Sequence, residues 1–341
     1  MLHFLRLTRP LNLLIIAATM AVMRVGVIDG HLGRGLHALA AEAGVPTDEL
    51  VRATDGLGAR MPVVHFVLLV LSTVLIAAGG NVINDYFDMR IDRINKPGRV
   101  IVGALVQRRK AMIGHWALSG AGMVLGLFVA WRSHLPHLAL IPAFSIIALW
   151  WYSLIFKRRW LIGNGLVALL TALVPLTVGL YEIPLLRRAH PGPVQAMLSN
   201  DMAFEIVPAF GDLWWWIGGY AAFAFLATLA REMQKDMADV KGDAAHGRRT
   251  IPIAWGMRAA RAITMLYIGI TIAGLLFVRA TVLTDPFSYW YIGLAVVLPL
   301  LLSAAFTYQA HDRRGHVRAG HLMKVAMVMA VAYALTIRFT G

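Results

Sequence analysis

Residues 62–92 read PVVHFVLLVLSTVLIAAGGNVINDYFDMRID, an apolar run that ends in a cluster of polar and acidic side chains. The run contains no Asp, Glu, Lys or Arg before position 85, and about 20 apolar residues suffice for a helix to cross a bilayer. Three aspartates then follow between positions 85 and 92. Because ionisable groups in membrane helices mark functional sites, this stretch predicts both a membrane fold and the place of a site.

Eight further apolar runs of similar length lie along the chain. The nine predicted spans cover residues 11–30, 62–84, 111–131, 136–156, 160–182, 213–231, 262–282, 288–308 and 319–338. Of the 341 residues, 59% are hydrophobic, only 15% are charged and none is cysteine, and the mean hydropathy is +0.67. These values exclude a soluble enzyme, a disordered protein and a disulfide scaffold. The sequence predicts an all-α polytopic membrane protein whose nine helices enclose a cavity open to the cytoplasmic side.

The basic residues predict the orientation of this domain. With the N-terminus in the cytoplasm, most of the 32 lysines and arginines fall in cytoplasmic segments, as the positive-inside rule requires. The odd number of spans places the C-terminus outside, and we expect the protein in the cell (inner) membrane. One transmembrane domain is expected over 1–341, with long outer loops at 31–61 and 183–212. Arg24, inside the first span, is expected to extend to the outer interface, and a place in the lining of the cavity is the alternative. Topology explains the net charge of +14, so no nucleic-acid partner is expected.

Most of the acidic residues on the predicted cytoplasmic side fall into two short clusters. The clusters are Asn84, Asp85, Asp88 and Asp92 at the end of the second span, and Asp236, Asp239 and Asp243 at the end of the sixth. Spacings of three and four residues place the members of each cluster on one helix face. Like charges at this spacing repel one another, so a cation is expected between them. Hard oxygen ligands of this kind suit Mg²⁺. A solvated salt-bridge network with neighbouring lysines and arginines is the alternative.

Basic residues that could bind phosphate surround both clusters. They are Lys96, Arg99, Arg231, Lys235, Arg248 and Arg249 beside the clusters, and Lys157 and Arg158, with Tyr152, on the loop between the fourth and fifth spans. Arginine forks and lysine point charges suit phosphate oxygens. Individually, each also fits the role of a positive-inside or lipid-binding residue.

These motifs resemble the UbiA superfamily of intramembrane prenyltransferases over most of the chain. The first motif, Asn-Asp-x-x-Asp-x-x-x-Asp, is complete over 84–92, and Arg9-Pro10-x-Asn12 is similar to the opening signature of the family. The second motif, REMQKDMADVKGD over 231–243 followed by RTIP, resembles the archaeal-type branch. That branch transfers a geranylgeranyl group to geranylgeranylglyceryl phosphate.

The resemblance implies Mg²⁺-dependent transfer of a prenyl group from its diphosphate, with these side chains in defined roles. The implied catalytic residues are Asp88, Asp92, Asp239, Asp243 and Lys157. The implied substrate-binding residues are Asn12, Asn84, Arg99, Tyr152, Arg158 and Arg249. The implied metal ligands are Asn84, Asp85, Asp88, Asp92, Asp236, Asp239 and Asp243. The partners would be an isoprenoid diphosphate, a lipophilic acceptor and membrane lipid, and the oligomeric state is left open.

Two departures from the branch leave other acceptors open. Ala238 stands where the branch often has glutamate, and the run from Val100 to Ala104 differs from the one that often follows the first motif. An aromatic quinone precursor, 4-hydroxybenzoate or 1,4-dihydroxy-2-naphthoate, is therefore an alternative acceptor. A cation-coupled transporter is a remote alternative, because transporters place ionisable residues near the midplane of the bilayer rather than at one face.

Overall fold

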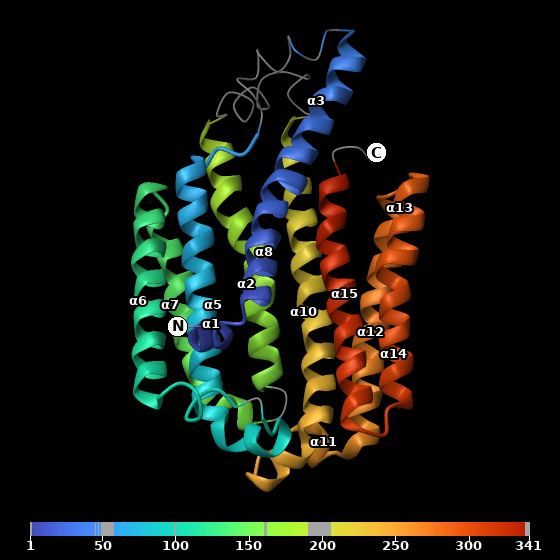
Figure 1. Ribbon diagram of the computed structural model, residues 1–341. Helices are drawn as coiled ribbons and strands as arrows, with labels where there is room; N and C mark the ends of the chain where they lie inside the picture. Colours follow the sequence, from blue (N-terminus) through green and yellow to red (C-terminus); the bar gives the residue numbers. More distant parts are fainter. Residues whose placement is uncertain are drawn as a thin grey trace.

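The fold was analysed in a computed structural model that describes residues 2–44, 46, 48, 58–98, 100–159, 162–189 and 206–337. This part of the chain is a bundle of long helices that run side by side (Figure 1). It contains no β-strand, only two isolated bridges. The all-α prediction is therefore confirmed for the described residues.

Nine helices of the described part are long and apolar enough to cross a membrane, which confirms the predicted spans. The helices that build these spans are α2 (Pro10–Val22), which continues through a π-helical segment (Met23–Asp29) into α3 (Gly30–Ala43), then α5 (Val63–Asn95), α6 (Arg108–Arg132), α7 (Leu140–Leu154), α8 (Ile162–Ala189), α10 (Ile206–Ala245), α12 (Gly256–Thr281), α13 (Pro286–Tyr291), which continues through a second π-helical segment (Ile292–Val297) into α14 (Leu298–Gln309), and α15 (Arg313–Tyr333). Two short helices, α1 (Leu2–Leu7) and α11 (Ile251–Ala254), lie between or before them.

Two helices extend well beyond the predicted spans. Helix α5 continues to Asn95 and α10 continues to Ala245, so both acidic clusters lie on the helices themselves. The two ends reach the same end of the bundle, where α11 also lies (Figure 1). Helices α5 and α10 also contact each other directly. This arrangement brings two clusters together that are about 150 positions apart in sequence.

Small residues allow close packing around α5. Helix α6 lies so near α5 that a Cβ atom added to Gly122 would be 2.9 Å from the carbonyl oxygen of Ser72. The Ser72 hydroxyl donates a hydrogen bond of 2.6 Å to the carbonyl of Gly122. Glycine and serine at helix contacts are typical of membrane bundles, because apolar burial does not drive helices together within lipid.

The half of the bundle away from the acidic clusters contains a large apolar core. Its apolar core includes Met20, Val27 and Leu213, which are fully buried. Within it, Arg24 forms an ion pair of 3.1 Å with Glu182 and lies 4.6 Å above the Phe66 ring. The prediction that Arg24 extends to the outer interface is therefore wrong. The arginine remains buried because a carboxylate of α8 and a backbone carbonyl, that of Met61, satisfy it.

The two segments predicted as long outer loops are only partly described. Helix α3 occupies Gly30–Ala43 of the first segment. Helices α8 and α10 extend into the second segment from either side, as far as Ala189 and from Ile206. Residues 45, 47, 49–57 and 190–205 lie outside the described residues. A single domain over 1–341 with two outer loops stays a prediction.

Candidate active site

An arginine joins the two acidic clusters. The guanidinium of Arg248 contacts Asp88 of α5 at 2.6 Å and Asp243 of α10 at 3.1 Å. All three side chains are buried. Burial lowers the pKa of Arg248, but the two carboxylates outweigh this effect and raise its pKa above the ordinary value. Arg248 directly follows the turn that ends α10, so the chain that carries one cluster also supplies the cation between the clusters.

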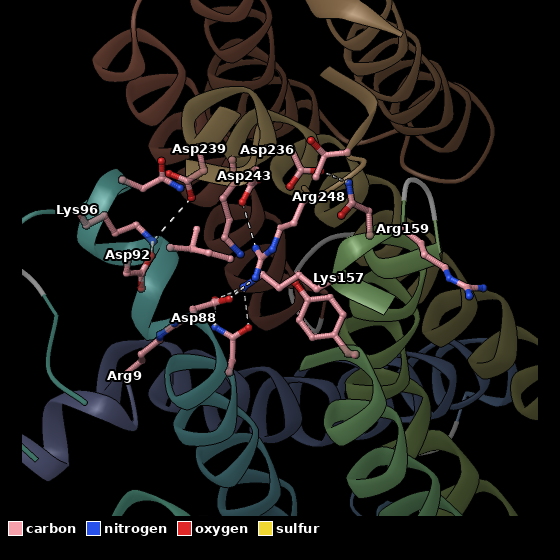
Figure 2. Close-up of a pocket in the computed structure, with 17 residues that line it drawn as sticks. Arg9, Asp88, Asp92, Lys96, Lys157, Arg159, Asp236, Asp239, Asp243 and Arg248 are labelled. Carbon is pink, nitrogen blue, oxygen red and sulfur yellow. Dashed lines mark hydrogen bonds and ion pairs between the residues drawn. The ribbon is translucent and has the colours of Figure 1, made fainter. Parts of the chain in front are cut away.

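A lysine forms a second bridge nearer the helix ends. The ammonium of Lys96 lies 3.2 Å from Asp92 and 3.7 Å from Asp239 (Figure 2). Arg313, at the start of α15, lies 3.5 Å from the other oxygen of Asp239. That oxygen, Oδ1, is buried and accepts no hydrogen bond from the described residues. It is therefore available to a further cation.

Lys157 connects the first cluster to the segment between α7 and α8. Its ammonium donates to Asn84 at 2.8 Å and forms a short ion pair with Asp88. It also lies 5.8 Å from the centre of the Tyr152 ring, a distance typical of a cation–π contact. Burial lowers the pKa of Lys157, and the nearby Asp88 opposes this shift only in part.

The remaining aspartates have partners of their own. Asp85 pairs with Arg9 at 2.5 Å, and Asp236 accepts a hydrogen bond of 2.8 Å from the Asn164 amide. Burial lowers the pKa of Arg9, but the nearby carboxylate of Asp85 outweighs this effect, so the pKa of Arg9 is raised. Asp85 does not line the small pocket described next, whereas Asp236 does.

These side chains surround a small polar pocket of about 30 Å³ (Figure 2). It is lined by Arg9, Asn84, Asp88, Asp92, Asn95, Lys96, Tyr152, Lys157, Asn164, Lys235, Asp236, Asp239, Asp243 and Arg248, among others. Carboxylate and amide oxygens dominate its acceptor groups, which is the donor set that Mg²⁺ prefers. No three acidic or histidine side chains of the described residues converge closely enough to hold an ion alone. Mg²⁺ in proteins usually takes one or two carboxylates and completes its shell with substrate phosphates and water.

A larger cavity of about 340 Å³ adjoins the polar pocket. The two share part of their walls: Arg9, Asn84, Tyr152 and Lys235 line both. Elsewhere the large cavity has mostly apolar walls, which include Ile16, Leu69, Ile76, Val174 and Met327. The charged polar pocket therefore lies next to a mostly apolar cavity.

The structure separates several residues that the sequence groups together. Asn12 lines the large cavity and not the polar pocket, and its amide oxygen accepts a hydrogen bond of 2.6 Å from Lys324. Arg249 is exposed and does not line the polar pocket, whereas its neighbour Arg248 does. Arg99 lies outside the described residues, as does the Arg158 side chain.

Other lining residues were missed because nothing in the sequence distinguishes them. Asn95 and Asn164 are single amides that belong to neither acidic cluster. Glu232 is buried between Arg231 and Lys235, at 3.2 and 3.0 Å. The sequence signals for Glu232 were its place directly after the predicted span 213–231 and within the second motif, since an acidic residue at the end of an apolar run needs a partner.

A membrane bundle that places paired carboxylates and cations against an apolar cavity is built to act on a lipid with a charged group. The chain belongs to the UbiA prenyltransferase family, whose sequence profile matches residues 56–328. It is thus a prenyltransferase enzyme of the membrane-helical type.

Relatives of established name agree with this family. The chain is 35% identical to the digeranylgeranylglyceryl phosphate synthase of Natronomonas pharaonis, over 69% of this chain and 72% of that protein. It is 30% identical to the enzyme of that name from Thermococcus kodakarensis, over 96% and 95%. The fold is similar to that of a UbiA homologue from Archaeoglobus fulgidus solved with GPP and Mg²⁺, with a TM-score of 0.54 and 15% identity over 98% and 99% of the two chains.

Proposed function

We propose that this enzyme transfers a geranylgeranyl group from geranylgeranyl diphosphate to geranylgeranylglyceryl phosphate in a Mg²⁺-dependent reaction. Relatives that match up to 96% of the chain carry the name of a synthase of this product. The main observation behind this proposal is the polar pocket, where the acidic clusters of α5 and α10 meet beside an apolar cavity. A polar head and an apolar tail of one substrate would fit these adjoining chambers.

The residues that would hold Mg²⁺ are Asp88, Asp92, Asp239 and Asp243, with Asn84, Asp85 and Asp236 as further members of the clusters. When bound, the metal would stabilise the negative charge on the departing diphosphate as a Lewis acid. Oδ1 of Asp239 supports this assignment, because this buried oxygen accepts no hydrogen bond from the described residues and has only a long ion pair, of 3.5 Å, with Arg313.

Lys157 and Arg248 would add fixed positive charge around the diphosphate. Both line the polar pocket, and each forms an ion pair with a different carboxylate oxygen of Asp88. Charges that are already oriented in a dry site stabilise developing charge without a cost of reorganisation. The shared wall at Tyr152 would bring the allylic carbon of the substrate next to the apolar cavity. An aromatic face there stabilises a cation by about 0.5–2 kcal/mol.

In the proposed reaction, the acceptor hydroxyl oxygen forms an ether bond to carbon 1 of the prenyl chain. The bond between that carbon and the diphosphate breaks, and its electron pair leaves with the diphosphate. The hydroxyl proton is released, with a diphosphate oxygen as its acceptor. Exclusion of water by the apolar cavity would prevent hydrolysis of the allylic cation.

We infer that the end of the bundle with the acidic clusters faces the cytoplasm. The positive-inside rule supports this orientation, since most lysines and arginines then lie on the cytoplasmic side. Arg9, which precedes α2, pairs with Asp85 of the first cluster, and α15 begins at Arg313 near Asp239 and runs to the far end of the bundle (Figure 1). An N-terminus in the cytoplasm and a C-terminus outside follow from this orientation.

An acceptor assay with the purified full chain tests the proposal. Geranylgeranyl diphosphate and Mg²⁺ would be supplied with geranylgeranylglyceryl phosphate, 4-hydroxybenzoate or 1,4-dihydroxy-2-naphthoate in separate reactions. We expect a diether phosphate from the first acceptor and no product from the two aromatic acids. Product from an aromatic acid alone would refute the lipid acceptor and leave the prenyltransferase class intact.

A further inference from the structure

The walls of the large cavity carry unbalanced positive charge. Its charged lining residues are Arg9, Arg231, Glu232, Lys235 and Lys324. Arg9 is neutralised by Asp85, which leaves three cations against the single carboxylate of Glu232, an excess of two positive charges. Unpaired charge is costly beside apolar walls, so an anion is expected in this cavity.

Lys324 accounts for one of these two positive charges. It lies in the membrane-spanning helix α15. Among the described residues, its polar contact is the amide oxygen of Asn12 at 2.6 Å, and no carboxylate is paired with it. An amide dipole orients an ammonium group but does not neutralise it. A lysine that faces a cavity within a membrane helix without a counter-ion is therefore a candidate ligand-binding residue.

Arg231 lies on a neighbouring helix and lines the same cavity as Lys324. Helix α10, which carries Arg231, packs against α15. Neither Arg231 nor Lys324 lines the small polar pocket, which has its own cations in Lys96, Lys157 and Arg248. Of the cations that line the large cavity, Arg231 and Lys324 are therefore left without a role in the diphosphate chemistry of the polar pocket.

We propose that Lys324 and Arg231 form a separate subsite that binds the phosphate monoester of the acceptor lipid, with Asn12 as a residue that positions Lys324. This inference rests on the proposed function and assigns its acceptor specificity to two side chains. A phosphate monoester carries about −1.5 to −2 charges at pH 7, which matches the excess of two. An aromatic carboxylate carries only a single negative charge and would leave the subsite half neutralised.

Steady-state kinetics of the full-length protein test this subsite. The acceptor would be geranylgeranylglyceryl phosphate or the same lipid without its phosphate, with geranylgeranyl diphosphate and Mg²⁺ held constant. The wild type should prefer the phosphorylated acceptor. Lys324→Met should raise the KM for this acceptor by about tenfold or more, because a charged hydrogen bond is lost. The KM for geranylgeranyl diphosphate and the kinetics with the dephosphorylated lipid should be unchanged.

Matched variants separate this role from a structural one. Arg318→Met removes an exposed cation from the same helix and should leave both acceptors unaffected. Lys324→Arg should keep most of the phosphate preference, and Arg231→Met should repeat the KM effect of Lys324→Met. Thermal unfolding of each variant identifies any that fails to fold.

Three results would overturn the proposal. In the first, Lys324→Met and Arg231→Met affect both acceptors equally. In the second, they lower kcat without changing the KM of the phosphorylated acceptor. In the third, the wild type uses both acceptors equally well. If the wild type transferred a prenyl group to neither lipid, the proposed function itself would fall, and the subsite with it.

Discussion

The side-chain carbonyl of Asn95 accepts a hydrogen bond of 2.8 Å from the backbone N–H of Gly242. The bond links the last residue of α5 to the final turn of α10, so it fixes the ends of the two acid-bearing helices against each other. Asn95 follows Asp92 by three positions, and Gly242 directly precedes Asp243. The spacing of carboxylates in the polar pocket therefore depends on a contact that involves no charge.

Gly242→Ala should disturb this contact. A Cβ atom there would lie 2.5 Å from Asn95, which is too close for any real contact. We expect a loss of stability of about 1–3 kcal/mol from overpacking, together with a lower kcat. Gly219→Ala on the same helix is the control, since its Cβ meets no atom within 4 Å. Thermal unfolding and turnover would be compared, and equal behaviour of the two variants would refute the role of the contact.

Asp239→Asn should abolish turnover and leave the protein folded. Asp239 has only long ion pairs, of 3.5 and 3.7 Å, so its loss removes little structural stabilisation. In the proposed mechanism Asp239 would hold the metal, so its loss should lower kcat by about 10³-fold. Asp88→Asn should be equally inactive and also less stable, because Asp88 holds both Lys157 and Arg248. Wild-type turnover in either purified variant would contradict the metal assignment.

Arg248→Met should be far more harmful than Arg249→Met. Removal of Arg248 leaves Asp88 and Asp243 buried without their shared cation, which costs about 3–5 kcal/mol for a buried pair. Arg249 is exposed, and its replacement should change stability by less than about 0.5 kcal/mol. Chemical or thermal unfolding in detergent measures both. A stable Arg248→Met variant would show that the two clusters tolerate each other without this arginine.

Removal of divalent metal should stop catalysis without unfolding the protein. The acidic clusters are already partly neutralised by Lys96, Lys157 and Arg248, so the metal is not required to hold α5 and α10 together. We expect EDTA to abolish turnover, Mg²⁺ to restore it, and the thermal midpoint to shift by only a few degrees. Unfolding on addition of EDTA would instead indicate a structural metal.

Arg24→Met should destabilise the protein more than the double variant Arg24→Met/Glu182→Gln. The single change leaves a buried carboxylate without its 3.1 Å partner, at a cost of about 3–5 kcal/mol. Glutamine at position 182 has no charge and can still accept the backbone hydrogen bonds from Arg60 and Met61. A double-mutant cycle on thermal unfolding would measure the coupling. A coupling energy near zero would contradict the importance of the pair.

The sequence predicts the spans and the two acidic motifs well, because both depend on local patterns. Twenty apolar residues in a row have few alternatives to a membrane helix, and aspartates three and four positions apart share a face of any helix. The spacing of the aspartates placed both clusters on helices, but the ends of α5 at Asn95 and of α10 at Ala245 were not predicted, since charged residues end an apolar run without ending the helix.

Contacts between distant segments could not be read from the chain. Arg248 and Arg249 are identical neighbours, and only the turn after α10 decides which of them faces Asp88. Lys324 and Asn12 are 312 positions apart, so their hydrogen bond depends on how α15 packs against α2. Such partners become visible only when the packing of the helices is known.

The buried pair of Arg24 and Glu182 also bears on the membrane as an electrical barrier. Tyr181 lines the large cavity, whereas the next residue, Glu182, does not line it and is paired with Arg24 beside the apolar core. Each elementary charge that crosses a bilayer at a membrane potential of 100 mV releases about 2.3 kcal/mol, so a continuous water-filled path through the bundle would let ions leak and dissipate this potential. The paired charges of Arg24 and Glu182, buried beside this apolar core, would oppose such a path while the cavity takes up a lipid substrate.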